Sequence, residues 1–473
     1  MVVETRGTIQ SINPATEELL AEFPEMTAAE VERALAQAQA AHERWRTTSF
    51  AERSARLQAA GRYLRDHKAE LARLMTLEMG KPIVQAEAEV EKCAFGCDWY
   101  AENAERLLAD EHVPTNARDS YIAYEPLGVI LAIMPWNFPF WQVIRPLAPA
   151  VMAGNAVVLK HASNVPQCAL ALERVAEEAG FPEGLLRTLL VRGSRVDPVI
   201  EDPRVRLVTL TGSDAAGAKV AAAAGRALKK TVLELGGSDP YIVLPDADLE
   251  QAATVAATAR NQNSGQSCIA AKRFVAVGAA ADEFERRFVE AVAALKVGDP
   301  LDRATQVGPL ARDDLRDVLD RQVRESVAQG ARVLLGGERM PGRGYFYQPT
   351  VLTNVTDRMA VFREETFGPV AAVVRAEDAE EALRLANDSP FGLGASVWSR
   401  DLSFAQRIAR RIEAGQVFIN GMVASDPRLP FGGVKRSGYG RELSGFGIRE
   451  LVNIQTIWIA PDVSPPPTSA KTE

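Results

Sequence analysis

Cysteine and histidine are scarce in this sequence, with four of each among 473 residues. So few cysteines do not make a disulfide scaffold, and a reducing compartment is expected. Cys93 and Cys97 lie one helical turn apart, but no second pair of metal-ligand residues lies near them in the sequence. This spacing favours core packing over a zinc site. We therefore expect no bound metal.

The sequence also lacks an excess of positive charge. Lys and Arg number 54 against 62 Asp and Glu, which gives a net charge of −8 and argues against binding to nucleic acid or an anionic membrane. No apolar run reaches the length needed to span a bilayer, and Met1 to Arg6 lacks the pattern of a secretory signal. A cytoplasmic enzyme acting on a small molecule is the resulting expectation.

The N-terminal region has the pattern of helices. Thr27 to Glu30 has the form of a capping box, and apolar residues recur at helical spacing to about Met79, before Gly80. A further amphipathic helix is predicted over 87–108. Beyond it, residues 120–124 alternate like a half-exposed strand, which we expect to pair with another subunit.

From residue 127 the pattern changes to short apolar runs separated by helical segments. Alternation of this kind predicts parallel strands with crossover helices. The chain is long enough for two or three domains, and a second alternation begins after Glu234, with Cys268 near its start. We expect a cleft between these units, and an extended or disordered tail over 464–469 after a last strand at 454–459. The predicted runs are 129–134, 156–159, 186–191, 205–210 and 232–235, then 241–244, 274–277 and 333–335.

Cys268 and Glu234 carry the chemistry of the sequence. A thiolate attacks a carbonyl carbon well, and a carboxylate that activates water can then hydrolyse the resulting thioester. A lone Cys is usually a small buried hydrophobe, and a Glu before two glycines is commonly a turn residue. The two together indicate oxidation through a covalent intermediate.

A phosphate-binding turn is predicted at Thr211-Gly212-Ser213. This segment follows a strand and opens an Ala-rich helix, so backbone N–H groups at the helix start can hold a pyrophosphate. The turn is not the G-x-G-x-x-G pattern, and a Gly-Ser connection is often only a tight turn.

The motifs together resemble the aldehyde dehydrogenase superfamily along nearly the whole chain. Within it, residues 160–166 are similar to those of bacterial succinate-semialdehyde dehydrogenases. The motifs that carry the resemblance are Pro135-Trp136-Asn137-Phe138-Pro139, Lys160, Thr211-Gly212-Ser213, Glu234-Leu235-Gly236-Gly237, Gly265-Gln266-Ser267-Cys268, Glu365-Thr366-Phe367-Gly368-Pro369 and Pro430-Phe431-Gly432-Gly433.

The resemblance implies an α/β fold in three parts. These are a Rossmann-type dinucleotide-binding domain at 1–111 and 127–236, a catalytic domain at 237–437, and a small β oligomerisation element at 112–126 and 450–461. A disordered tail would occupy 462–473. The family also implies a homodimer, or a homotetramer built from dimers.

The resemblance further implies a role for each matching residue. The Asn137 side chain and the Cys268 backbone N–H would hold the oxyanion, and Glu234 would activate the hydrolytic water. Lys160 would bind the adenosine ribose, Ser213 the pyrophosphate and Glu365 the nicotinamide ribose, with Phe367 beside it. The rest of the expected cofactor-binding set is Trp136, Ser163, Thr211, Gly212 and Leu235.

Ser163 bears on the choice of cofactor. NAD-preferring relatives often carry Glu three residues after the Lys, where it binds the ribose hydroxyls and repels a 2′-phosphate. Ser removes that repulsion and can donate a hydrogen bond to phosphate. NADP is therefore expected to be preferred, with NAD as the other cofactor.

Arg145 and Ser425 form the predicted substrate site. Relatives acting on succinate semialdehyde carry Arg and a hydroxyl at these places, and a guanidinium can bind the distant carboxylate. A helix-surface ion pair for Arg145 and a loop hydroxyl for Ser425 are the alternatives. Gln262 stands where some relatives carry a further Arg.

Three other functions remain open from the sequence. One is a dehydrogenase for medium-chain or aromatic aldehydes, if Arg145 points elsewhere. Another is a CoA-acylating enzyme, although these often lack the residue matching Glu234, and CoA dependence would identify it. The third is a non-catalytic binding protein, which absence of NADPH formation with any aldehyde would favour.

Overall fold

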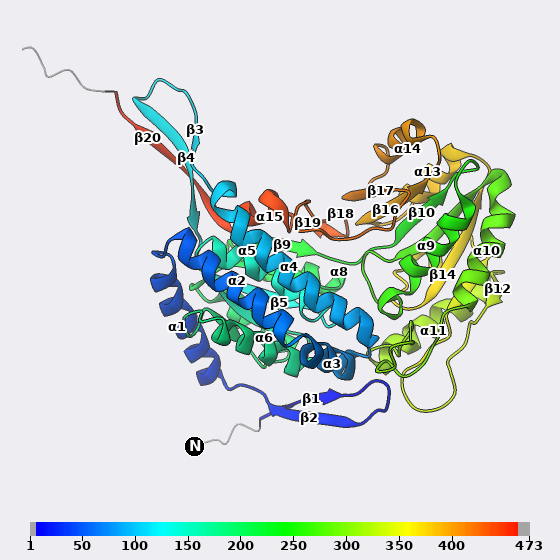
Figure 1. The fold of residues 1–473 in the computed structure, drawn as a ribbon, viewed down its shortest axis with the longest axis horizontal. Helices are drawn as coiled ribbons and strands as arrows, with labels where there is room; N and C mark the ends of the chain where they lie inside the picture. The colour runs from blue at the N-terminus through cyan, green and yellow to red at the C-terminus, as the bar shows by residue number, and fades with distance from the viewer. Residues whose placement is uncertain (1–5, 462–473) are drawn as a thin grey trace, which may run out of the picture.

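Two mainly parallel β-sheets organise the chain in a computed structural model that describes residues 6–461. Each sheet lies in its own lobe, and a β arm projects from the first lobe (Figure 1). These two sheets confirm the α/β fold with two alternating units that the apolar runs predict.

The first lobe begins with a hairpin, β1 (Thr8–Ile12) and β2 (Leu19–Pro24), followed by four helices. The predicted capping box is confirmed, because Thr27 and Glu30 bond reciprocally at the start of α1. The region predicted as helical to Met79 is divided into three helices, and Gly80, with φ of 79°, ends the last. The four helices are α1 (Ala28–Trp45), α2 (Phe50–Asp66), α3 (Lys68–Met79) and α4 (Ile83–Leu107).

The first sheet has the strand order β19-β9-β8-β5-β6-β7. Five strands are parallel, and β19 (Gly438–Tyr439) is antiparallel at one edge. The order reverses between β5 and β8, which places a crevice at the carboxyl ends of the strands. The parallel strands are β5 (Val129–Met134), β6 (Ala156–His161), β7 (Leu186–Thr188), β8 (Val205–Thr211) and β9 (Lys230–Glu234), with helices α5 (Trp141–Met152), α6 (Pro166–Glu178), α7 (Asp197–Glu201) and α8 (Asp214–Arg226).

One strand of this sheet is shorter than predicted. The sequence predicts a strand over 186–191, but β7 ends at Thr188. Beyond it, the Leu190 carbonyl accepts a hydrogen bond from the Met26 amide, which lies outside the sheet.

The second sheet has the order β12-β13-β14-β11-β10-β16-β17, and its neighbouring strands are parallel except for β12. Apolar clusters cover both of its faces, as expected for a parallel sheet. Its strands are β10 (Asp239–Val243), β11 (Ala271–Val277), β12 (Arg332–Leu335), β13 (Thr350–Thr353), β14 (Val370–Ala376), β16 (Gly394–Trp398) and β17 (Gln416–Ile419), with helices α9 (Leu249–Asn261), α10 (Ala281–Ala293), α11 (Asp313–Ala328), α12 (Ala360–Arg363), α13 (Ala379–Asn387) and α14 (Leu402–Ala409).

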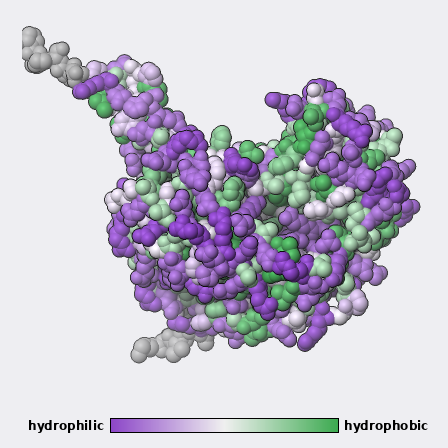
Figure 2. All heavy atoms as spheres, viewed as in Figure 1, coloured by the Kyte–Doolittle hydropathy of each residue, from purple (hydrophilic) through white to green (hydrophobic). Residues whose placement is uncertain are grey.

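The arm pairs two segments far apart in the chain. Strand β20 (Val452–Ile459) runs antiparallel to β4 (Asp119–Pro126), which also pairs with β3 (Glu111–His112). Both strands were predicted. Ile454 and Trp458 are about half exposed on β20. The arm stands away from the rest of the molecule, and its visible surface is mainly hydrophilic (Figure 2). The short helix α15 (Ser444–Glu450) leads into β20.

Several other sequence predictions can be placed. Cys93 and Cys97 are buried free thiols in the core of the first lobe. The predicted tail at 464–469 lies outside the described residues. Within residues 6–461, no helix is both long and apolar enough to cross a membrane.

Candidate active site

The loop before Cys268 has an unusual backbone. Asn263, Ser264 and Gly265, within the short helix η2 (Gln262–Gly265), have φ of 54°, 55° and 74°. A Cβ at position 265 would lie 2.4 Å from the Gly368 carbonyl, so only glycine fits this close approach. Residues held in the left-handed region store strain and cluster at functional sites. Cys268 lies between this turn and the start of β11 at Ala271.

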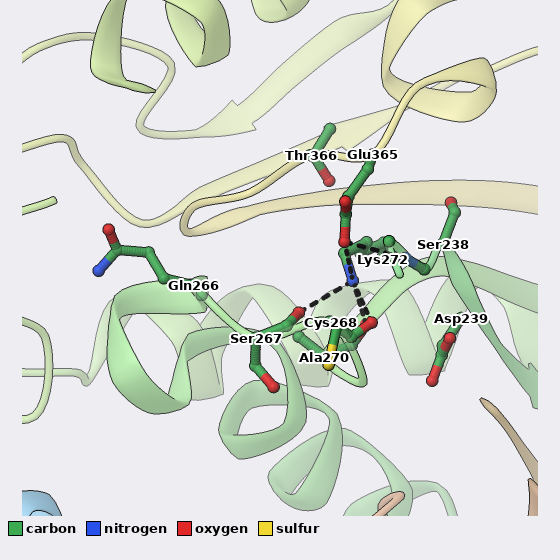
Figure 3. Close-up of polar contacts among 12 residues, drawn as sticks. Ser238, Asp239, Gln266, Ser267, Cys268, Ala270, Lys272, Glu365 and Thr366 are labelled. Atoms are coloured by element: carbon green, nitrogen blue, oxygen red, sulfur yellow. Dashed lines mark hydrogen bonds and ion pairs between the residues drawn. The ribbon is translucent and has the colours of Figure 1, made fainter. Parts of the chain in front are cut away.

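Lys272 stabilises this loop through hydrogen bonds to its backbone carbonyls. Its ammonium donates to the carbonyls of Ser267, Cys268 and Ala270 at 3.0, 2.8 and 3.2 Å, and Glu365 lies 3.5 Å away as an ion pair (Figure 3). The side chain is fully buried, so these contacts replace its water shell. Sequence reasoning missed Lys272, although two adjacent charged residues, Lys272 and Arg273, in an otherwise apolar strand were the available signal.

The Cys268 thiol lies in the wall of a cavity. Burial raises the pKa of Cys268 to about 12, although the positive charges of Arg145 and Lys272 oppose that rise. The sulfur is therefore a thiol near neutral pH. A thiolate is the nucleophile, so a base has to remove this proton.

Glu234 ends β9 and is 2 % exposed. Neither of its carboxyl oxygens has a hydrogen-bond partner among the described residues. Burial and the neighbouring carboxyl of Glu442 raise the pKa of Glu234 well above its usual value, against the opposing charges of Arg145 and Arg441. A carboxyl group in such surroundings is a candidate acid–base catalyst.

Asn137 lies in the loop between β5 and α5 and is tied to the Cys268 loop. Its Nδ2 donates to the Gln266 carbonyl at 3.1 Å, and its own carbonyl accepts from Asn263 Nδ2 at 2.7 Å. An amide carries two N–H hydrogens, so one remains after the bond to Gln266. The fold thus connects Asn137 to the loop of the predicted nucleophile.

The cavity beside Cys268 measures about 100 Å³. It lies among α4, α5, the Cys268 loop and the segment after β17. The predicted substrate residues Arg145 and Ser425 both line it. Other lining residues are Lys92, Trp141, Gln262, Cys268, Val423 and Phe431.

Arg145 is a buried ion-pair partner rather than a residue of the helix surface. Its Nε lies 2.7 Å from Glu442 Oε2, at an angle too bent for a hydrogen bond. Its Nη2 donates to Thr211 Oγ1 at 3.2 Å, and its guanidinium lies over the Phe431 ring. Glu442 was not predicted as a partner of Arg145, because the two residues lie nearly 300 positions apart in the chain.

Ser425 accepts two hydrogen bonds at the cavity wall. Lys92 Nζ donates to its oxygen at 2.7 Å, and Trp141 Nε1 donates at 2.9 Å. Lys92 is another residue that sequence reasoning missed, because a Lys on an amphipathic helix ordinarily faces solvent.

The predicted cofactor residues gather at the carboxyl ends of the first sheet. The Trp136 and Phe367 rings meet edge to face, with centroids 5.7 Å apart. The Gly212 amide donates to the Glu234 carbonyl, and the Leu235 amide donates to the Ser437 carbonyl, each at 3.0 Å.

The helix start and Lys160 present unused donors. Ser213 caps α8 by accepting from the Ala216 amide, which leaves its own O–H free to donate. Lys160 is the second-last residue of β6, and burial lowers its pKa. Among the described residues its ammonium has no hydrogen-bond or ion-pair partner. Ser163 is half-buried in the loop that follows.

Comparison with known proteins identifies the family of the chain. The model of the "Aldehyde dehydrogenase family" matches residues 2–457. A succinate-semialdehyde dehydrogenase of Mycobacterium avium, named for NADP(+), is 54 % identical over 95 % of this chain and 96 % of its own. A corresponding protein of Mycobacterium tuberculosis is 53 % identical over 96 % of this chain and 100 % of its own.

A solved structure gives the same result for the fold. The succinic semialdehyde dehydrogenase of Streptococcus pyogenes in complex with NADP+ superposes with a TM-score of 0.94 at 38 % identity, over 96 % of this chain and 100 % of its own. With matches of this extent in sequence and in structure, the chain belongs to the aldehyde dehydrogenase family.

Proposed function

We propose that this enzyme oxidises succinate semialdehyde to succinate with NADP. The observation that supports this most directly is that the Cys268 thiol shares one small cavity with the Ser425 hydroxyl and the cationic side chains of Arg145 and Lys92. An aldehyde carbon at sulfur and a carboxylate at the far end suit such a cavity. The relatives named for this substrate and for NADP(+) support the proposal.

The proposed reaction begins when Cys268 loses its proton and its sulfur bonds to the aldehyde carbon. The carbonyl oxygen becomes an oxyanion, held by the free N–H of Asn137 and by the Cys268 amide. Loss of hydride from that carbon restores the C=O bond and leaves a thioester. A bound nicotinamide supplies the hydride acceptor.

Glu234 then completes the cycle. Its carboxylate takes a proton from water, the water oxygen attacks the thioester carbon, and the C–S bond breaks to release the acid. A buried carboxyl group with a raised pKa is a candidate for acid–base catalysis. The initial Cys268 proton would pass to solvent, so only the deacylation half of the reaction depends on Glu234.

The chain's unused donors fit the proposed dinucleotide. The unpartnered Lys160 ammonium and the free Ser213 hydroxyl are suited to ribose and pyrophosphate. Ser163 brings no negative charge beside Lys160, so a 2′-phosphate meets no repulsion there. Trp136, Phe367, Glu365, Thr211, Gly212 and Leu235 complete the proposed cofactor site.

We further propose that the parts of the chain divide the work. Residues 1–111 and 127–236 would bind the dinucleotide, 237–437 would carry the nucleophile, and 112–126 with 450–461 would join subunits into a homodimer or homotetramer. The exposed β20 edge supports that last role. The four free thiols support a cytoplasmic location.

A steady-state comparison of substrates tests the proposal. Succinate and glutarate semialdehydes, butanal and an aromatic aldehyde would each be offered with NADP and with NAD. The highest kcat/KM is expected for succinate semialdehyde with NADP. Equal or higher kcat/KM for butanal or the aromatic aldehyde would contradict the proposed substrate, and a strong preference for NAD would contradict the cofactor.

A further inference from the structure

Lys92 is a cation in the wall of the Cys268 cavity without an anionic partner. Its Nζ donates to the neutral Ser425 hydroxyl at 2.7 Å and lies 4.8 Å from the centre of the Trp141 ring. Within residues 6–461, no carboxylate oxygen lies within 4.0 Å of this nitrogen. A partly buried charge is costly unless it is paired, so this arrangement suits an anionic ligand.

The neighbouring cations are already matched by carboxylates. Arg145 pairs with Glu442 at 2.7 Å, and Lys272 pairs with Glu365 at 3.5 Å on the other side of the Cys268 loop. Gln262, which also lines the cavity, is neutral. Lys92 is therefore the source of unbalanced positive charge among the cavity's lining residues.

Ser425 adds a donor beside Lys92. Its oxygen has two lone pairs, and both are used by the bonds from Lys92 and Trp141. The hydroxyl hydrogen must then point to another acceptor. An ammonium and a hydroxyl 2.7 Å apart can each donate to one oxygen of a carboxylate.

We propose that Lys92, together with Ser425, binds the distal carboxylate of the substrate and makes the enzyme selective for aldehydes that carry one. This inference rests on the proposed oxidation of succinate semialdehyde. Under this proposal, Arg145 lines the cavity and forms an ion pair with Glu442. The Lys92 ammonium provides the charge by which the enzyme distinguishes a semialdehyde from a neutral aldehyde.

The surroundings of Lys92 give the selectivity a pH dependence. Burial and the positive charge of Arg145 on α5 lower the pKa of Lys92 to about 8, opposed by Cys93 and Glu89 on α4 and by Asp426 in the neighbouring loop. The ammonium is charged below this pKa and loses its proton above it. Selectivity for a carboxylate should therefore fall as the pH rises through about 8.

The first test compares succinate semialdehyde with butanal, which has the same four-carbon chain without a carboxylate. Lys92→Met removes the charge, Lys92→Arg restores it, and Lys68→Met removes an ammonium on the neighbouring helix α3 as a control. In Lys92→Met, kcat/KM for succinate semialdehyde should fall about 10- to 100-fold, mainly through KM. The butanal value should change by less than about 3-fold, and Lys92→Arg should recover much of the loss.

Equal losses of kcat/KM on both aldehydes in Lys92→Met would overturn the inference, and so would wild-type values of kcat/KM for both. A second measurement needs no variant: in the wild-type enzyme the ratio of kcat/KM for succinate semialdehyde to that for butanal should fall above about pH 8. A ratio that stays flat from pH 7 to 9.5 would overturn the inference too.

The same data separate this inference from the proposed function. If the wild-type enzyme does not favour succinate semialdehyde at any pH, the proposed function fails. If the wild type favours it and Lys92→Met keeps that preference in a folded protein, only the role of Lys92 fails.

Discussion

Burial sets the protonation of the two reactive residues. The pKa values of Cys268 and Glu234 are both raised, so the free enzyme holds a thiol and a carboxyl group that favours its neutral form. Cys268 must lose its proton before it can attack the aldehyde, and Glu234 must lose its proton before it can accept one from water. Substrate and cofactor binding next to Cys268 would change these surroundings.

Replacing Glu234 with Gln should separate the two halves of the reaction. Gln keeps the size of the side chain but cannot accept the proton from water, so steady-state turnover should fall about 100- to 10,000-fold. Rapid-mixing experiments should still show a first turnover of NADPH and a thioester on Cys268, detectable by intact-protein mass. Full turnover without an accumulated acyl-enzyme would remove Glu234 from deacylation.

Replacing Ser163 with Glu should reverse the choice of cofactor. The added carboxylate would repel a 2′-phosphate, and the ratio of kcat/KM with NADP to that with NAD should fall about 10- to 100-fold. Ser163→Ala is the matched control, since it removes the hydroxyl without adding charge. The same ratio in Ser163→Glu and the wild type would show that Ser163 does not contact the phosphate.

Local sequence predicted some site residues and not others. Short motifs contain Asn137, Glu234 and Cys268, and the residue types in these motifs indicate the chemistry that each side chain can perform. The roles of Lys92, Lys272 and Glu442 come instead from tertiary contacts, and Lys92 meets Ser425 across 333 positions of the chain. A single charged residue in a helix or strand carries no sign of such a distant partner.

The secondary structure elements were more predictable than the site, because the spacing of apolar residues reports directly which backbone faces are buried. The strands from Val129 to Glu234 and the arm strands lie close to their predicted bounds. The early end of β7 at Thr188 was not predicted, because the apolar residues continue through Leu189, Leu190 and Val191.

Helix α5, which carries Trp141 and Arg145, is held at its start by a residue of α4. Glu89 is buried, and its Oε1 accepts from the amides of Phe140 and Trp141 at 3.0 Å each. Its other oxygen pairs with the buried ammonium of Lys81. A carboxylate at a helix N-terminus also complements the helix dipole.

Glu89→Leu should therefore be strongly destabilising. It leaves the Lys81 charge unpaired and two amides without an acceptor, at a cost of about 3–5 kcal/mol in the free energy of unfolding. Glu91→Leu on the same helix removes only an exposed partner of Arg65 and Lys68 and should cost less than about 1 kcal/mol. Urea unfolding measures both values, and similar values for the two variants would contradict the importance of the Glu89 contacts.

At the scale of the whole molecule, the arm is the feature that a single chain leaves open. The β20 edge is unpaired within residues 6–461, and Ile454 and Trp458 are 59 % and 50 % exposed. An edge strand with apolar side chains favours pairing with another chain.

Trp458→Asp should lower the molar mass measured by light scattering, because a charge in a subunit contact is costly. Gln455→Asp, which adds the same charge at an exposed position on the opposite side of β20, should have a smaller effect. A wild-type protein that is monomeric at micromolar concentration would rule out the proposed role of the arm.

The proposed reaction depends on the bond between the sulfur of Cys268 and the carbon being oxidised. The most direct measurement is the rate of NADPH formation from succinate semialdehyde by a folded Cys268→Ala variant that still binds NADP. The rate should fall to that of a reaction without enzyme. NADPH formation at close to the wild-type rate would contradict the mechanism.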